Sequence, residues 1–140
     1  MLLYTFSTAF SVVSADTYDS QIKVISDAEY YSWGWVGTPA KPSDAEVAAR
    51  EISGKVNSKQ LSLALNNASN SGRLYLLCLL HRIDKKAFTQ KASEFFKADD
   101  IHVSVFTGDV LSDASAKSMV KNIALHGCDP LSWPSSKNKK

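Results

Sequence analysis

The chain has 140 residues, enough for one domain, and its 44% hydrophobic and 21% charged residues match ordinary globular usage. A chain of this length can bury a core without a structural metal or several disulfides. Its formal net charge of +2 is too small to indicate nucleic acid or an anionic membrane as a partner.

The N-terminal segment has the features of an export signal. Residues 2–15 carry no charge and are too few to cross a membrane, which takes about 20 apolar residues. The segment ends in Val13-Ser14-Ala15, a pattern that signal peptidase accepts. We therefore predict a signal peptide over 1–15 and a periplasmic or secreted mature chain, with no integral membrane segment after cleavage. A buried N-terminal strand is the alternative, because no Lys or Arg precedes the apolar run.

Residues 16–42 are predicted to form a strand and aromatic segment ahead of the helices. Gln21–Ile25 alternates polar and apolar residues, which favours a short strand. The stretch 28–36 is rich in aromatic residues and fits either a second strand or a loop packed on the core. A breaker segment, Gly37–Pro42, closes this region.

The stretch 43–127 is predicted to be a helical domain. Ser43-Asp44-Ala45-Glu46 is a capping box, and the helix that follows is expected to bury Val47, Ala48 and Ile52. Asn57 to Gln60 repeats the capping pattern. The next helix carries apolar residues at spacings of three and four: Leu61, Ala64, Leu65 and Ala68.

The segment Arg73–Ile83 is apolar on almost every side, which is typical of a buried central helix. Asp84 is expected to cap a further helix that continues through Phe96. A half-buried strand is predicted over Ile101–Phe106, from its alternating pattern.

A turn at Thr107-Gly108-Asp109 precedes the last predicted helix, which Asp113 is expected to cap and Gly127 to end. Residues 128–140 are predicted to be a C-terminal tail. The predicted fold class is therefore mostly α (α+β): an antiparallel helical bundle of about five helices with one or two short strands.

The two cysteines, Cys78 and Cys128, fit an exported chain, because an even pair in an oxidising compartment indicates one disulfide. Such a bridge would close a loop of about 50 residues and contribute about 4 kcal/mol in the chain-entropy model. The alternative is that Cys78 is a small core residue of an apolar helix.

The stretch Gly72-Arg73-Leu74-Tyr75-Leu76-Leu77-Cys78-Leu79-Leu80, followed by Asp84 and Phe88, resembles a family of small exported bacterial proteins of uncharacterised function. The resemblance covers roughly residues 43–127 and includes Val105-Phe106-Thr107-Gly108-Asp109. It implies bacterial export and a helical fold, but no activity. In that family a cysteine often follows the turn glycine and would pair with the helix cysteine. Asp109 holds that place here, which leaves Cys128 as the remaining partner.

No catalytic, cofactor or metal signature stands out. The histidines are not spaced as a zinc motif, and Gly34-Trp35-Val36-Gly37 lacks the context of a phosphate loop. His102 could pair with Asp109, which would suit a small periplasmic hydrolase. However, no serine lies in a strained elbow such as GxSxG.

The aromatic residues are the best candidates for partner binding, since exposed aromatic side chains concentrate at protein interfaces. They are Tyr30, Tyr31, Trp33 and Trp35. The sequence thus favours a non-enzymatic protein-binding domain of the bacterial envelope, for example an inhibitor or immunity-type protein. The alternatives are the hydrolase, a structural envelope protein with no discrete site, and a core position for these aromatics.

Charge is distributed unevenly along the chain. Residues 1–51 carry three cations against seven carboxylates, a net of −4, and the remainder carries thirteen cations against seven carboxylates, a net of +6. Lysines that keep helix surfaces soluble account for this pattern. A basic face for an acidic partner is the functional alternative.

Overall fold

The computed structural model describes residues 18–34, 41–98 and 100–134. This part of the chain forms six α-helices and a small sheet of three strands, so the predicted mostly α class with some β structure is confirmed. The helices are α1 (Asp19–Ser26), α2 (Asp44–Ile52), α3 (Ser58–Ala64), α4 (Asn70–Ile83), α5 (Lys85–Phe95) and α6 (Ala116–His126). The strands are β1 (Tyr31–Ser32), β2 (His102–Thr107) and β3 (Val110–Ser115). Two short 3-10 turns complete the set, η2 (Leu65–Asn67) and η3 (Pro130–Ser132).

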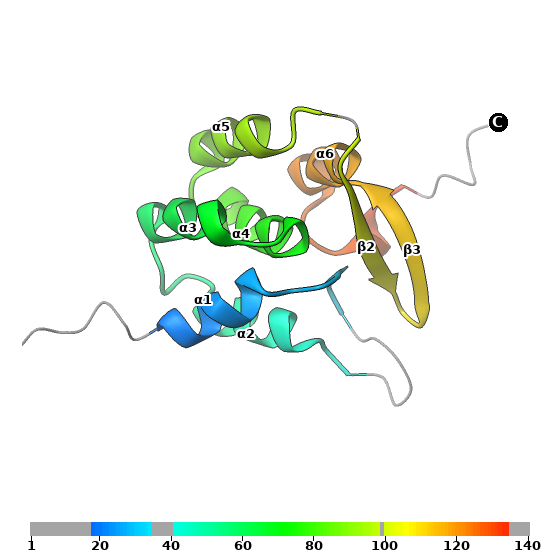
Figure 1. The fold of residues 1–140 in the computed structure, drawn as a ribbon, viewed down its shortest axis with the longest axis horizontal. Helices are drawn as coiled ribbons and strands as arrows, with labels where there is room; N and C mark the ends of the chain where they lie inside the picture. Colours follow the sequence, from blue (N-terminus) through cyan, green and yellow to red (C-terminus); the bar gives the residue numbers. More distant parts are fainter. Residues whose placement is uncertain (1–17, 35–40, 99, 135–140) are drawn as a thin grey trace, which may run out of the picture.

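Helix α4 is the centre of the fold. Every residue from Leu74 to Leu80 is buried, and the remaining α-helices all pack against α4 or against a helix that does. In Figure 1, α5 lies on one side of α4, and α1 and α2 lie on the opposite side. A helix that is apolar all round needs this kind of enclosure, so the predicted central helix is confirmed.

Most helices begin at a side-chain cap that the sequence marks. Asn57 and Gln60 form the full reciprocal capping box at α3, and Asp84 accepts a hydrogen bond from the Ala87 amide at α5. Ser43 caps α2 through the Glu46 amide at 3.1 Å, as predicted. The predicted burial of Val47 is wrong, since its side chain is 39% exposed.

The predicted strand over Gln21–Ile25 is wrong, because these residues belong to helix α1. Ile22 and Ile25 are three residues apart and share the face that packs on the core, while Val24 between them is 42% exposed. A five-residue window fits both the helical and the strand period, and packing against α2 and α4 selects the helix.

The sheet has the order β1-β2-β3. Strand β1 runs parallel to β2, and β2 and β3 form an antiparallel hairpin. The predicted strand over Ile101–Phe106 is confirmed within one residue at each end, whereas β3 was not predicted. The expected cap of the last helix is also wrong: Ser115 caps α6, and Asp113 lies within β3.

The segment after α6 folds back on the body of the protein. Gly127 ends α6 with a φ of +86°, as its position predicted. The Trp133 indole then donates a hydrogen bond to the Gly127 carbonyl at 2.8 Å. Residues 128–134 of the predicted tail are therefore held against the fold. Within the described ranges, none of the helices is long and apolar enough to cross a membrane.

Candidate functional site

The aromatic segment predicted to bind a partner lies largely in the core. Tyr31 is 0% exposed and Trp33 is 7% exposed, so these two side chains offer no surface to a partner and the prediction is corrected for them. The Tyr31 ring packs 4.7 Å from the Tyr75 ring, between centroids. Tyr30 is half-buried, and Trp35 lies outside the described residues.

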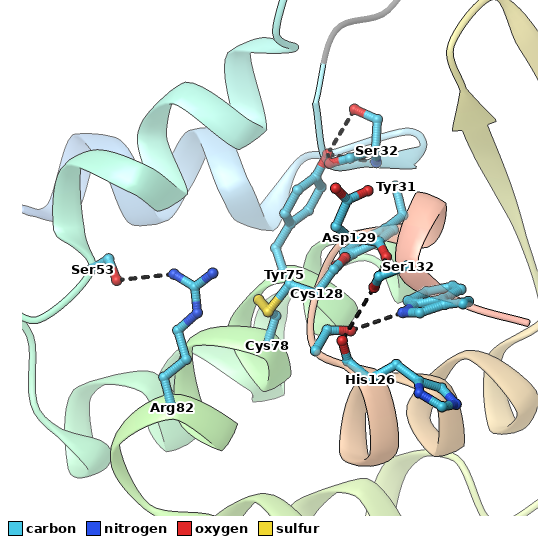
Figure 2. The surroundings of a disulfide bond; sticks show 12 residues. Tyr31, Ser32, Ser53, Tyr75, Cys78, Arg82, His126, Cys128, Asp129 and Ser132 are labelled. Atoms are coloured by element: carbon cyan, nitrogen blue, oxygen red, sulfur yellow. Dashed lines mark hydrogen bonds between the residues drawn. A yellow bond between two sulfur atoms is a disulfide. The ribbon is translucent and has the colours of Figure 1, made fainter.

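Buried hydroxyl groups hold this segment in place. The Tyr75 hydroxyl accepts a hydrogen bond from the Ser32 amide at 2.9 Å and donates one to the Ser32 carbonyl at 2.8 Å. It also lies 3.2 Å from the Ser43 hydroxyl at the start of α2. Figure 2 shows Tyr75 reaching from α4 toward Ser32. A network whose buried members all have partners stabilises one arrangement of the surrounding backbone.

Burial also changes the acidity of the two tyrosines. Desolvation raises the pKa of Tyr31 well above its ordinary value, and it raises the pKa of Tyr75 against the opposing effect of the hydrogen bonds from Ser32 and Ser43. Both groups are structural, because each hydroxyl already has a partner in the protein: Tyr31 donates to the Cys128 carbonyl.

The disulfide joins helix α4 to the segment that follows α6. Cys78 and Cys128, 50 residues apart, are bonded and buried, which confirms the predicted bridge. Figure 2 shows the bond beside Tyr31 and Tyr75. The bridge is therefore part of the same buried cluster as the aromatic residues, and its role in this structure is to fix the C-terminal segment.

Trp33 is held between helices by two cations. The guanidinium carbon of Arg50 lies 4.7 Å from the ring centroid, and that of Arg82 lies 5.0 Å away. Arg50 is anchored by the buried carboxylate of Glu46, which also accepts a hydrogen bond from the Gly34 amide at 2.6 Å. These contacts connect α2, α4 and the end of the aromatic segment.

The structure does not bring His102 and Asp109 together. His102 begins β2 and Asp109 lies in the turn beyond its far end, about 17 Å away for five strand residues. The His102 Nδ1 atom instead lies 2.9 Å from Asp113 Oδ2, with side-chain exposures of 52% and 70%. A pair this exposed lacks the burial that tunes catalytic groups, so the geometry does not favour the hydrolase.

The other histidines do not complete a site either. His81 packs edge-on against Phe88, and desolvation lowers its pKa. His126 ends α6 and is exposed. Among the described residues, no group of three His, Cys, Asp or Glu side chains could hold a metal ion.

The β2–β3 hairpin offers the best candidate surface, because none of the residues of β3 is buried. Strand β3 is at the edge of the sheet, and its first two residues expose large apolar side chains: Val110 at 61% and Leu111 at 56%. Successive strand residues point to opposite faces, so the exposed apolar surface continues on both sides of the strand.

On one face of the hairpin, Leu111 lies directly across from Phe106, and Phe106 contacts Tyr30 edge-on with ring centroids 4.8 Å apart. Tyr30 is therefore the one described member of the predicted aromatic set that contributes to this surface. The sequence did not predict this apolar surface, because strand β3, which supplies Leu111, was not predicted.

On the other face, a groove of about 380 Å³ separates the hairpin from helix α6 and the C-terminal segment. Val105 and Ala114 form its strand side, and Met119 lies on the α6 side. Leu131, which is 71% exposed, and the half-buried Trp133 close it from the C-terminal segment. The hairpin thus combines an open strand edge with an adjoining groove.

Comparison with known proteins identifies no relative. No protein-family model, no curated protein and no solved structure matches this chain.

Proposed function

We propose that this chain is an exported, non-enzymatic protein-binding domain of the bacterial envelope, for example an inhibitor or immunity-type protein. It binds a partner that adds an extended strand to the free edge of β3. The observation that carries this proposal is the exposed edge strand with Val110 and Leu111 at 61% and 56% exposure. Edge strands are ready templates for strand addition, a common mode of peptide recognition.

The backbone of β3 favours this mode of binding. Thr107 and Val110 flank a two-residue turn, in which Gly108 has the positive φ, +65°, that a type II′ turn requires. The pair that flanks such a turn is hydrogen-bonded, and along an antiparallel ladder hydrogen-bonded and non-hydrogen-bonded pairs alternate. Leu111 and Asp113 therefore belong to non-hydrogen-bonded pairs, and their amide and carbonyl groups point away from β2. These outward groups are available to a partner strand.

The sequence of β3 also leaves the edge open. Proteins commonly block such an edge with lysine or proline, and Val110–Ser115 contains neither. Its one charged residue, Asp113, is engaged by His102 across the hairpin. Side chains of an added strand would alternate between the groove beside α6 and the apolar surface around Leu111 and Phe106.

Export is supported by two independent features. The uncharged segment 2–15 ends in a cleavage pattern, and the disulfide between Cys78 and Cys128 is typical of oxidising compartments. N-terminal sequencing of the protein purified from the cell envelope or the medium tests export, and we expect the mature chain to begin at Asp16. An intact N-terminus in a protein that stays inside the cell would contradict it.

Two variants at one position test the binding mode. Both Leu111→Pro and Leu111→Thr remove the leucine side chain, but only proline removes the outward amide. A partner is first captured by crosslinking in the envelope fraction and then purified, and its affinity for each variant is measured by calorimetry. We expect Leu111→Pro to bind roughly tenfold more weakly than Leu111→Thr, because backbone hydrogen bonds to the partner are lost.

The outcomes separate the alternatives. Equal affinities for the two variants would contradict strand addition, since the backbone would then make no contribution. A partner-free protein that forms a dimer in ultracentrifugation, reversed by Leu111→Pro, would show that the edge pairs with a second copy instead. Circular dichroism of both variants checks that the hairpin and helices are retained.

A further inference from the structure

A second groove lies on the other side of helix α6, between α6 and α5. Its volume is about 380 Å³. The apolar residues that line it come from one stripe of each helix. On the α5 side they are Phe88, Ala92 and Phe96, the last of which directly follows the helix. On the α6 side they are Val120 and Ala124.

The groove follows from the way the helices pack. Helices α5 and α6 both pack on α4 (Figure 1), and residues of both helices line the groove. Phe88, Ala92 and Phe96 lie at the base of the groove and are buried, so most of its open apolar surface comes from the α6 side. Val120 is half-buried and Ala124 is exposed, and no element in the described part of the chain covers them.

The rim of the groove is basic. Lys97 lies on the α5 side, and Lys117 and Lys121 lie on the α6 side, one turn apart. None of the described residues that line the groove is acidic. Three of the thirteen cations of residues 52–140 thus lie on this rim, on both sides of the apolar floor.

We propose that this groove binds an acidic amphipathic helix of a partner protein. A furrow between two helices matches the shape of a third helix, and helix-in-groove binding places apolar residues at i, i+3, i+4 and i+7 on the floor. Carboxylates that flank this apolar stripe would then meet Lys97 on one side and Lys121 on the other. Charges arranged in this way at a rim favour association and select the partner.

The dimensions agree with a short helix. Phe88 on α5 and Phe96, which directly follows the helix, are eight residues apart, which corresponds to about 12 Å, or a little over two helical turns. The groove is open along this length, whereas sites for lipid chains or other small ligands enclose most of the ligand surface. An open groove with a basic rim therefore fits a peptide helix better than a fatty acid.

This binding surface is separate from the edge of β3 and does not depend on the function proposed for that edge. Met119 and Asn122 of α6 line the groove beside the hairpin, whereas Val120 and Lys121 line the groove beside α5. The two surfaces can thus be disabled one at a time.

The test uses a designed helical peptide with leucines at i, i+3, i+4 and i+7 and glutamates on both flanks. Its binding to the full chain is followed by fluorescence polarisation and mapped by amide chemical-shift changes. We expect a Kd below about 1 mM, shifts centred on Ala92 and Val120, and weaker binding as salt is raised. A peptide of the same composition with permuted leucines is expected not to bind.

Charge reversal supplies the matched variants. Lys97→Glu with Lys121→Glu is expected to weaken binding roughly tenfold or more. The control pair, Lys55→Glu with Lys59→Glu, makes the same change in net charge at exposed positions outside the groove and is expected to have less than about a twofold effect. Leu111→Pro is expected to leave peptide binding unchanged, which distinguishes this site from the edge of β3.

Four results would overturn the proposal: no binding of the acidic peptide at about 1 mM, equal binding of the permuted peptide, equal loss in the control pair, or shifts that map elsewhere. Binding to vesicles of phosphatidylglycerol but not to the peptide would identify an anionic membrane surface as the occupant and would also reject the helix.

Discussion

Helix α4 and strand β3 of the β2–β3 hairpin differ sharply in burial. The residues from Leu74 to Leu80 are each at most 2% exposed, whereas four successive residues of β3, Val110 to Asp113, are exposed. Helix α4 is held by a disulfide, by hydrogen bonds of the Tyr75 hydroxyl and by packing on all sides. Strand β3 is held mainly by its backbone pairing with β2. Stability and binding are therefore expected to depend on different residues.

The largest stability effect is expected from the disulfide. The double variant Cys78→Ala, Cys128→Ala should lose about 4 kcal/mol of unfolding free energy, because the unfolded chain regains the freedom of a 50-residue loop. Urea unfolding of the variant and of the wild type, with and without reductant, measures the loss. If reduction leaves the midpoint of the wild type unchanged, the bridge does not stabilise the fold.

A smaller loss is expected where α1 crosses α4. A Cβ atom on Gly72 would lie 2.5 Å from the Ile25 carbonyl oxygen and 3.0 Å from the Ser26 Cα, both backbone atoms that cannot rotate away. Gly72→Ala should therefore cost about 1–3 kcal/mol, since the two helices must move apart. Asn70→Ala, at an exposed position of the same helical turn, is the control and should remain close to the wild type in thermal unfolding.

The hydroxyl of Tyr75 is expected to contribute about 1–3 kcal/mol. Tyr75→Phe keeps the ring but leaves the Ser32 amide buried with no acceptor from Tyr75. Urea unfolding measures the loss, and Tyr18→Phe, at a partly buried ring near the N-terminal end of α1, serves as the control. A neutral result for Tyr75→Phe would show that another acceptor replaces the hydroxyl.

Alkaline pH should weaken the same region. The pKa of Tyr31 and that of Tyr75 are raised above 10.0 in the folded protein, so the unfolded chain releases these two protons first. The contribution of these two tyrosines to the free energy of unfolding is fully present below pH 10. It falls by about 1.4 kcal/mol per pH unit for each group as the pH rises toward the pKa values of the folded protein. Tyrosinate absorbance followed alongside circular dichroism tests this, and ionisation of both groups without loss of structure would contradict it.

The smallest effect is expected in the hairpin. Leu111→Thr retains strand propensity and removes an apolar side chain that is 56% exposed, so the free energy of unfolding should change by less than about 0.5 kcal/mol. Denaturant unfolding checks this value. A loss comparable to that of Tyr75→Phe would show that the apolar cluster with Phe106 and Tyr30 is part of the core, and the contrast between the two regions would fail.

The sequence by itself determined the elements whose signal is local. Caps at Ser43, Asn57 and Asp84, the apolar run of α4 and the terminator Gly127 each depend on neighbouring residues, and all were predicted. The pairing of Cys78 with Cys128 could also be predicted, because there were no other cysteines to choose from.

The tertiary structure decided the features that depend on distant partners. Tyr31 and Trp33 are buried because Tyr75, Arg50 and Arg82 come from other helices to cover them, and no pattern within residues 30–35 encodes those contacts. Residues 110–115 alternate only weakly and are largely exposed. They form strand β3 because β2 supplies the backbone partners for it. The candidate binding surfaces belong to this second group: local chemistry sets each element, but a free edge or an open groove appears only once the elements have packed.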